Sequence, residues 1–351
     1  MKGLAMQSNV GVGIIGSGFM GRTWTEVAAH HTPSARLAAI AGGRRAPGLA
    51  GEYDVRALAI PDLFARRDVT AVVLATPPST HVDLAVAAAA VGKHVFIEKP
   101  MATTIADCDR IIDACDAAGV RLAVVSQHRW RNTPRAAHRL VDEGAIGEVR
   151  MIRVMGPTAG WDAPDDTWKM DPDEQTAFAD WGAHACDITR WFAGSEPTLA
   201  YARSASFSPT PPPEQSTMAI YEFGNGVLAD FWLTYEIPQP GLGSALQFLI
   251  TGSDGMLEFD AYGALRHGKG DEWTTVYEQP PFDPLDPNSP GRLEAYALQL
   301  GDFLASIGTD RRPAVDGRSG RATTEMLEAA DRSVRSGQAV RLPLHSIATR
   351  T

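Results

Sequence analysis

The chain has 351 residues, which is more than one average domain, so we expect two domains. Hydrophobic residues make up 44% and charged residues 21%, a composition that argues against a disordered chain, a collagen-like repeat and a membrane protein. The net charge of -10 offers no basic surface for nucleic acid or anionic lipid. The expected partner is therefore a small neutral or polar molecule, with no nucleic acid and no membrane.

The N-terminus and the cysteines bear on the cellular compartment. The first ten residues, MKGLAMQSNV, hold no apolar run of signal-peptide length, and no apolar segment of about 20 residues occurs in the chain. The cysteines are odd in number, and two of them lie seven residues apart in a helical pattern, so we interpret them as small buried hydrophobic residues. They are Cys108, Cys115 and Cys186. These features favour a cytoplasmic protein.

Short apolar runs alternate with helical patterns over residues 1–130, which predicts an α/β domain with a doubly wound parallel sheet of the Rossmann type. The expected strands are Val10–Ile15, Leu37–Ala41, Ala71–Ala75, Val95–Ile97 and Leu122–Val125. The expected helices are Gly18–Ala29, Thr80–Val91 and Thr104–Ala118. Gly92 and Gly119 stand where a helix ends in a left-handed residue. We therefore expect a dinucleotide-binding domain here.

The first loop of this domain carries a glycine motif. Gly16, Gly18 and Gly21 form G-x-G-x-x-G between a predicted strand and a predicted helix, where backbone N–H groups can approach a pyrophosphate. A chance match among 33 glycines is the alternative, and the strand-loop-helix context disfavours it. The residues expected at the cofactor from this loop are Gly16, Ser17, Gly18, Phe19, Met20 and Gly21.

The end of the second strand bears on the choice between NAD and NADP. A site for NAD usually has an acidic residue here for the ribose 2′-hydroxyl, but this chain reads AIAGGRRAP, with Arg44 and Arg45 after two glycines. Arginines in this place suit a 2′-phosphate, which favours NADP over NAD. The alternative is that both are solvated loop charges.

The stretch FIEKPMATT places Lys99 at the carboxyl end of the run Val95–Ile97, the edge at which parallel sheets bind ligands. Pro100 favours an extended backbone at Lys99, which holds the lysine out toward the crevice. The alternative is a surface ion pair of Glu98 and Lys99 at the end of a strand. The predicted cofactor contacts are completed by Thr76, Pro77, His81, Glu98 and Lys99.

A further motif, DWGAHACD, occupies residues 180–187. It opens a predicted helix whose apolar face is Ala183, Cys186, Ile188, Trp191 and Phe192. Asp180 and His184 are four residues apart on this helix, so they share one face, and a carboxylate beside an imidazole orients it and raises its basicity. A structural histidine, an N-cap aspartate or a metal site that includes Asp187 are the alternatives. We expect no metal, because no second histidine is nearby.

Together, the glycine motif, the EKP of residues 98–100 and DWGAHACD resemble the Gfo/Idh/MocA oxidoreductases, named for glucose-fructose oxidoreductase and inositol dehydrogenase. The resemblance spans nearly the whole chain, including GAIGEVRMIRV and the final AVRLP. It implies an NAD(P)-dependent dehydrogenase or reductase that moves a hydride between nicotinamide and a hydroxyl or carbonyl of a sugar, cyclitol or related polyol. Two alternatives stay open: an NAD-dependent glycosidase of the same family and a non-catalytic cofactor-sensing protein.

The resemblance also implies roles for individual residues. Lys99, Asp180 and His184 match the family's catalytic set, with His184 as the base, Asp180 holding it and Lys99 bonded to the reacting oxygen. Arg129 matches a position where family members often place a basic residue toward the pocket. Indole rings suit the C–H faces of sugars, and Trp161, Trp168 and Trp181 flank the catalytic stretch. The predicted substrate contacts are Lys99, Arg129, Trp161, Asp180 and His184.

The sequence pattern of residues 131–351 predicts an α+β domain with a large, mainly antiparallel open sheet. Asn225-Gly226 and Asp254-Gly255 lie between alternating runs, which is typical of hairpin turns. Helical patterns cover 293–307 and 322–336, and the proline-rich stretches SPTPPPE and QPPFDPLDPNSPG are expected to be loops. The resemblance implies a homodimer or homotetramer assembled through this sheet.

Overall fold

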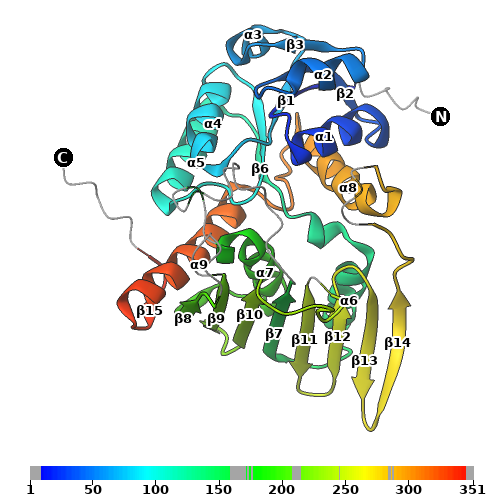
Figure 1. The fold of residues 1–351 in the computed structure, drawn as a ribbon, viewed down its shortest axis with the longest axis vertical. Coiled ribbons are helices and arrows are strands. Elements are labelled where there is room, and N and C mark those ends of the chain that lie inside the picture. Colours follow the sequence, from blue (N-terminus) through cyan, green and yellow to red (C-terminus); the bar gives the residue numbers. More distant parts are fainter. Residues whose placement is uncertain are drawn as a thin grey trace. The chain divides into compact units, whose positions relative to one another are not determined.

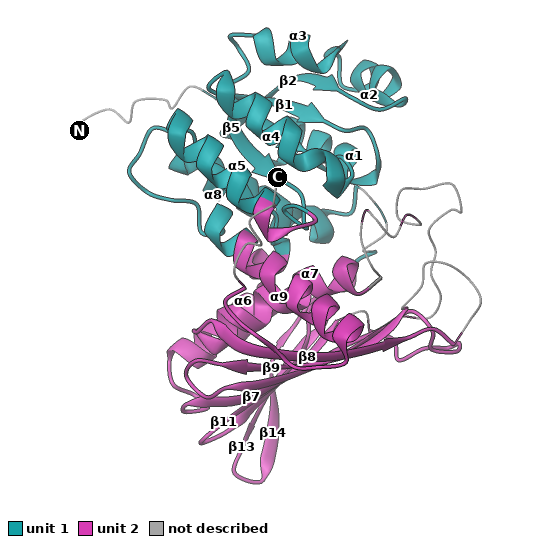
Figure 2. Cartoon of the chain, turned by 90° about the vertical axis from the view of Figure 1, so that its left-hand side faces the viewer, with its two compact units in different colours: residues 1–102, 107–127, 282–320 teal, residues 103–106, 128–281, 321–351 magenta. Residues whose placement is uncertain are grey.

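The computed structural model describes residues 9–158, 171, 174, 177–207, 215–244, 246–283, 286 and 288–344. The chain divides into two compact units (Figure 2). Unit 1 comprises residues 1–102, 107–127 and 282–320, and unit 2 comprises residues 103–106, 128–281 and 321–351. Trp161, Trp168 and the stretch SPTPPPE at 208–214 lie outside the described residues.

Unit 1 contains a six-stranded sheet in which every pairing is parallel (Figure 1). Its order is β3-β2-β1-β4-β5-β6. The strands are β1 Val10–Ile15, β2 Ala35–Ala41, β3 Arg56–Leu58, β4 Ala71–Leu74, β5 His94–Ile97 and β6 Leu122–Val124. This order reverses between β1 and β4, the place where doubly wound sheets bind nucleotides. The Rossmann prediction is confirmed, and β3 was missed because its three residues form no apolar run.

The helices of unit 1 pack their apolar faces on this sheet. They are α1 Phe19–Glu26, α2 Ala46–Glu52, α3 Ile60–Ala65, α4 His81–Ala90, α5 Ile105–Ala118 and α8 Pro290–Ser306, with a short π-helical turn at Val27–His31 and a 3-10 turn at Pro78–Thr80. Gly92 and Gly119 have φ of 73° and 67°, the left-handed ends expected for α4 and α5. Helix α8 comes from far along the chain, yet Leu293 and Phe303 lie in the same core cluster as Phe96.

Unit 2 contains a nine-stranded sheet in the order β14-β13-β12-β11-β7-β10-β9-β8-β15. The strands are β7 Val149–Pro157, β8 Pro197–Ala205, β9 Ser216–Phe223, β10 Leu228–Thr234, β11 Gln247–Gly252, β12 Met256–Asp260, β13 Ala264–Lys269, β14 Glu272–Glu278 and β15 Val340–Arg341. Within the described strands of this sheet, β7 and β10 pair in parallel and the other pairings are antiparallel. The predicted turns at Asn225-Gly226 and Asp254-Gly255 join β9 to β10 and β11 to β12, as expected.

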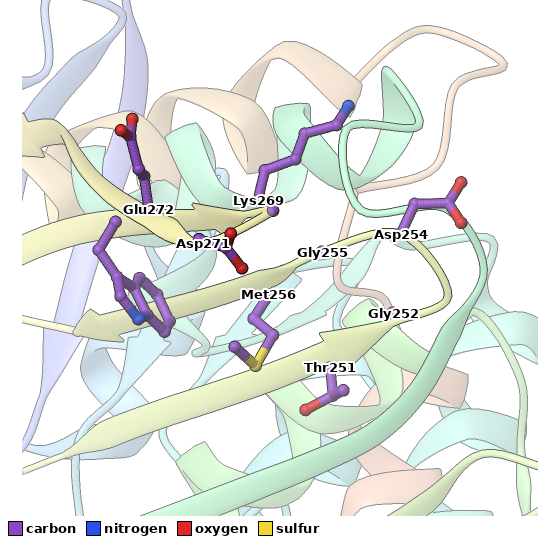
Figure 3. Close-up of a pocket in the computed structure, with 11 residues that line it drawn as sticks. Thr251, Gly252, Asp254, Gly255, Met256, Lys269, Asp271 and Glu272 are labelled. Atoms are coloured by element: carbon purple, nitrogen blue, oxygen red, sulfur yellow. The ribbon is translucent and has the colours of Figure 1, made fainter.

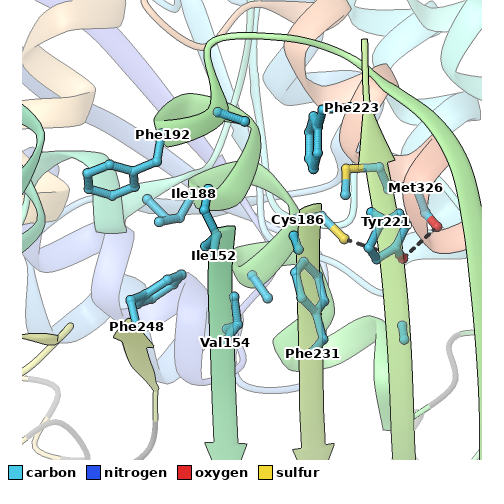
Figure 4. Packing of buried hydrophobic residues seen from close by; sticks show 14 of the residues in the cluster. Ile152, Val154, Cys186, Ile188, Phe192, Tyr221, Phe223, Phe231, Phe248 and Met326 are labelled. Atoms are coloured by element: carbon cyan, nitrogen blue, oxygen red, sulfur yellow. Dashed lines mark hydrogen bonds between the residues drawn. The ribbon is translucent and has the colours of Figure 1, made fainter. Parts of the chain in front are cut away.

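Helices cover one face of this sheet (Figures 1 and 2). They are α6 Asn132–Asp142, α7 Ala177–Ala193 and α9 Gly317–Ser336, and a short 3-10 turn spans Gln127–Trp130. Burial alternates along β9 and β10, so that Tyr221 and Phe231 point into the core beneath α7 and α9. Tyr221 donates a hydrogen bond to the Met326 carbonyl at 3.1 Å, and its ring lies beside Cys186 (Figure 4). One face of the sheet is therefore core, as the alternating sequence pattern indicates.

In the described part of the chain, no helix combines the length and the apolar character that crossing a bilayer requires. The three cysteines are buried, and none of them forms a disulfide with another described residue.

Candidate active site

The glycine-rich turn of unit 1 is shaped by contacts that exclude a side chain. Gly16 has φ of 118°, and a Cβ there would lie 2.2 Å from the Ala75 carbonyl oxygen. A Cβ at Gly21 would lie 2.2 Å from the Gly16 oxygen, which fixes the start of α1 against the turn. At Gly18 a Cβ would meet nothing within 4 Å, so the space beside the second glycine is open. This arrangement fits a dinucleotide whose pyrophosphate approaches the helix start.

The end of β2 lies against the same turn. Gly42 and Gly43 have φ of 75° and 82°, and a Cβ at Gly43 would lie 2.4 Å from the Ser17 Oγ. Arg44 and Arg45 follow with exposed side chains, and neither has a carboxylate partner among the described residues. The absence of an acid after β2, noted from the sequence, therefore leaves two exposed cations directly after Gly43.

Glu98 is a buried carboxylate at the end of β5. Trp24 of α1 donates its indole N–H to one oxygen at 2.8 Å, and the backbone N–H of Lys99 donates to the other at 3.1 Å. Burial raises the pKa of Glu98, while these two bonds and the nearby charges of Lys99 and Arg292 act to lower it. Because Glu98 is only 6% exposed, it does not form the surface ion pair considered as an alternative. Its contacts instead fix the backbone of Lys99, whose bond to Pro100 is cis.

His81 lies behind this loop and does not extend into open space. Its ring is fully buried, with Nδ1 3.2 Å from the Pro100 carbonyl oxygen and Nε2 2.9 Å from the Thr76 carbonyl oxygen. The sequence predicted a direct cofactor contact for His81. In the structure both ring nitrogens face backbone oxygens, so His81 links the loops that follow β4 and β5.

In unit 2, helix α7 places Asp180 and His184 one turn apart on the same face. The Tyr235 hydroxyl, just beyond β10, donates to Asp180 Oδ2 at 3.2 Å. His184 is 8% exposed, and its ring meets the rings of His128 and Trp181 with centroids 4.6 Å and 5.9 Å apart. The Tyr235 hydroxyl thus positions the Asp180 carboxylate, and the rings of His128 and Trp181 position the His184 imidazole. These neighbours come from separate elements.

The ring of His128 leads to a second aromatic group. It meets the Tyr262 ring at 5.3 Å, and the guanidinium of Arg131 lies over Tyr262 at 4.4 Å. Sequence analysis named neither Tyr235 nor Tyr262 as part of a site. No local signal marks them, because they follow β10 and β12, and only the sheet brings them to α7 and the turn at residues 127–130.

Arg129 forms an ion pair with Asp187 inside unit 2. Its guanidinium makes two bonds to Asp187, both 2.7 Å long, and the two side chains are 14% and 4% exposed. Its carbon centre also lies 5.7 Å from the Trp191 ring. A bidentate pair uses the fork of donors that would bind an anionic substrate. The structure therefore gives Arg129 a role in fixing α7, and the substrate contact expected from the sequence stays a prediction.

A shallow groove elsewhere in unit 2 lies between the turn ends of two hairpins (Figure 3). Asp254, Lys269, Asp271 and Glu272 give it charges of both signs. None of the residues predicted for the site lines it. Across the described residues, no three His, Cys, Asp or Glu side chains gather as a metal-ligand set.

Comparison with known families decides the assignment. Residues 10–126 match the oxidoreductase family with an NAD-binding Rossmann fold, and residues 135–258 match the GFO/IDH/MocA C-terminal domain. The chain belongs to the GFO/IDH/MocA family. The resemblance inferred from its motifs is confirmed, and unit 1 carries the NAD-binding Rossmann sheet of this oxidoreductase family.

Several family members are similar over much of this chain. The inositol 2-dehydrogenase of Rhizobium meliloti is 28% identical over 335 residues, covering 92% of this chain and 96% of that protein. Inositol 2-dehydrogenase 2 of Saccharopolyspora erythraea is 32% identical over 228 residues, or 62% of this chain and 65% of that protein. Among solved structures, the aldose-aldose oxidoreductase from Caulobacter crescentus complexed with glycerol has a TM-score of 0.82 and 25% identity, covering 95% and 100% of the two chains.

The pairing of Arg129 with Asp187 can be tested through stability. Arg129→Met leaves a buried carboxylate without its cation, so we expect the free energy of unfolding to fall by about 3 kcal/mol in urea titrations. The control is Arg22→Met, which removes a similarly short but exposed pair with Glu52 and should lower the stability much less. Equal losses in the two variants would contradict a buried structural pair.

Burial of Glu98 predicts a pH effect. Because the pKa of Glu98 is raised in the fold, the folded chain binds the proton of this carboxyl more tightly than the unfolded chain does. The resulting stabilisation is fully present below the unfolded pKa of 4.5. It is lost as the pH rises through the raised value. We therefore expect the stability of the wild type relative to Glu98→Gln to decrease from about pH 4 toward neutrality, as measured by urea unfolding.

Glu52 offers a control of opposite sign. Its hydrogen bond with Arg22 lowers its pKa, so its contribution is present above 4.5 and is lost as the pH falls. The stability of the wild type relative to Glu52→Gln should increase with pH. A flat or rising curve for Glu98→Gln would show that Glu98 is not buried as described.

Proposed function

We propose that this chain is an NAD(P)-dependent oxidoreductase that transfers a hydride between the nicotinamide and a carbinol or carbonyl carbon of a cyclitol, sugar or related polyol. The observation that carries the proposal is the Asp180 and His184 pair on α7, with Tyr235 bonded to the aspartate. The inositol dehydrogenases and the aldose-aldose oxidoreductase named above support the substrate class.

The cofactor belongs to unit 1 in this proposal. Gly16, Gly18 and Gly21 hold the pyrophosphate through backbone N–H groups, with Ser17, Phe19 and Met20 beside them. Thr76 and Pro77 follow β4 and lie at the sheet edge where its strand order reverses. When bound, the nicotinamide supplies the centre that accepts or returns a hydride. We propose that unit 2 supplies the substrate contacts. The division near residue 130 is part of this proposal, and residues 282–320 pack in unit 1.

The side chains supply proton transfer and charge stabilisation. His184 takes the proton from the substrate hydroxyl as general base, and Asp180 orients the ring and stabilises its charged form. Tyr235 fixes the aspartate by its bond to Oδ2. Lys99 donates a hydrogen bond to the reacting oxygen and stabilises its developing negative charge. Glu98 serves this step by holding the Lys99 backbone.

Substrate binding follows from the same groups. Lys99, Asp180 and His184 contact the reacting hydroxyl, and Trp181 offers a ring face next to His184. Trp161 stays a proposed contact, since it lies outside the described residues. Arg129 positions α7 through Asp187 and stays a proposed substrate contact.

Removing a proton-transfer group should lower turnover without releasing the cofactor. We expect Lys99→Ala and His184→Ala each to lower kcat by roughly two to four decades, while the Kd for the cofactor stays within about threefold. The double variant should lose less than the product of the two single losses, because both groups act on one oxygen. The control is Lys269→Ala, an exposed lysine of unit 2. Near-normal turnover in Lys99→Ala would return Lys99 to a structural role.

We also propose a preference for NADP over NAD. Arg44 and Arg45 follow β2 with exposed side chains and without a carboxylate partner in the described part of the chain, and no acid directly follows the strand to bind a ribose 2′-hydroxyl. We expect tighter binding of NADP in calorimetric titrations, and a Kd for NADP raised about tenfold in Arg44→Ala and Arg45→Ala combined. The Kd for NAD is the internal control and should not change. Tighter binding of NAD by the wild type would end this proposal.

A homodimer or homotetramer through the sheet of unit 2 is proposed as well. The face opposite the helices exposes large apolar side chains on four neighbouring strands, which is unusual for a free surface. They are Met151 at 53%, Tyr201 at 37%, Met218 at 65%, Ile220 at 49% and Leu228 at 48% exposure. Light scattering of Ile220→Asp should show dissociation relative to the wild type. Leu298→Asp on α8 is the control, and a monomeric wild type would refute the proposal.

A further inference from the structure

A buried cation lies against the glycine-rich turn of unit 1. Arg292, in the first turn of α8, is only 2% exposed. Its Nη2 donates to the Thr23 Oγ1 at 3.0 Å and lies 3.8 Å from the Met20 Sδ. The carbon at the centre of its guanidinium lies 4.7 Å from the centre of the Phe19 ring. Arg292 thus touches three of the first five residues of α1.

The guanidinium is incompletely paired. Its Nη1 is buried and has no hydrogen-bond partner among the described residues. Most buried polar atoms in proteins are bonded, and a charged donor left unbonded is costly. The face of Tyr296, 4.9 Å away, and the Phe19 face attract the cation without bonding its N–H groups. A buried positive charge of this kind implies a compensating negative charge.

One candidate for that charge is already in the protein. Glu98 is linked to Arg292 through rings: Trp24 donates to Glu98, the Trp24 ring meets Tyr296 at 5.1 Å, and Tyr296 lies under Arg292. However, the oxygens of Glu98 accept from the N–H groups of Trp24 and Lys99. Among the described residues no hydrogen bond joins Glu98 to Arg292, whose charge acts on Glu98 through space and helps to lower its pKa. Glu98 therefore leaves Nη1 of Arg292 without a direct partner.

The second candidate is the ligand of the turn itself. Phe19 is the first residue of α1, and Thr23 bonds back to its carbonyl oxygen, so the contacts of Arg292 follow the first turn of the helix. Backbone N–H groups at this end attract an anion, and a fixed cation beside them adds to that attraction. Phe19 is 48% exposed although its ring rests on the guanidinium, so Arg292 holds an exposed residue of the turn in place.

We propose that Arg292 is a positioning residue for the dinucleotide: it holds Phe19 and the first turn of α1, and its buried charge strengthens binding of the pyrophosphate. This inference rests on the proposed function, since it requires that unit 1 binds a dinucleotide. In this proposal α8 contributes to cofactor binding although it lies late in the chain, far from the glycine motif in sequence.

The test compares ligands that differ in phosphate charge. Binding of ADP-ribose and of adenosine is measured by calorimetry for the wild type, Arg292→Gln, Arg292→Lys and Arg22→Gln. We expect Arg292→Gln to bind ADP-ribose about tenfold more weakly and adenosine unchanged, and Arg292→Lys to stay within about threefold of the wild type. Arg22→Gln, which removes an exposed charge from the same helix, should bind as the wild type does.

The outcomes separate this inference from the function on which it rests. A wild type that binds no ADP-ribose refutes dinucleotide binding itself. If the wild type binds ADP-ribose and the folded Arg292→Gln variant binds it equally well, the role of Arg292 is overturned but dinucleotide binding is not. The same holds if Arg292→Gln loses affinity for ADP-ribose and adenosine equally. If Arg292→Gln does not fold, Arg292→Lys decides, because a loss of tenfold or more with the charge retained contradicts the electrostatic role. Thermal melting of each variant establishes that it is folded.

Discussion

The carboxylate of Glu98 is buried at the end of β5. Because burying a carboxylate is costly unless it accepts hydrogen bonds, its neighbours must supply donors. One oxygen requires the Trp24 indole, which ties α1 to β5, and the other requires the Lys99 amide, which fixes the loop that follows. Trp24 in turn packs against Phe96 and Tyr296, so α8 joins the same assembly. The glycine-rich helix and the lysine loop are therefore held by one buried acid.

Unit 2 also buries a carboxylate, and there an arginine pairs with it. Asp187 is nearly fully buried and is neutralised by both donors of Arg129, which anchors α7 to the turn at residues 127–130. One and two turns earlier on the helix, His184 contacts the ring of His128 and Asp180 accepts a hydrogen bond from Tyr235. The ion pair fixes the position of this helix, and the proton transfer that we propose for His184 requires a fixed position.

The sequence predicted the parts of this structure that are encoded locally. Apolar runs and helix-ending glycines located the parallel strands, and Asn225-Gly226 and Asp254-Gly255 located two hairpins, because turn chemistry acts over a few residues. It could not reveal the pairing of Arg129 with Asp187, since a surface arginine and one paired across the fold look alike in sequence. The contacts of His81 with the Thr76 and Pro100 carbonyl oxygens are likewise invisible in the sequence. The packing of α8 in unit 1 and the positions of Tyr235 and Tyr262 depend on contacts distant in the chain, which periodicity does not record.

The central claim is hydride transfer from a polyol carbon, and isotopic labelling tests it most directly. The purified protein would be incubated with NADP or NAD and with inositols or aldoses deuterated at their carbinol carbons, and the reduced cofactor would be examined by mass spectrometry. The account predicts reduced nicotinamide carrying one deuterium from the substrate, formed together with the corresponding carbonyl product. Turnover of a glycoside that releases its aglycone without net cofactor reduction, or no turnover across the panel while cofactor binds, would contradict it.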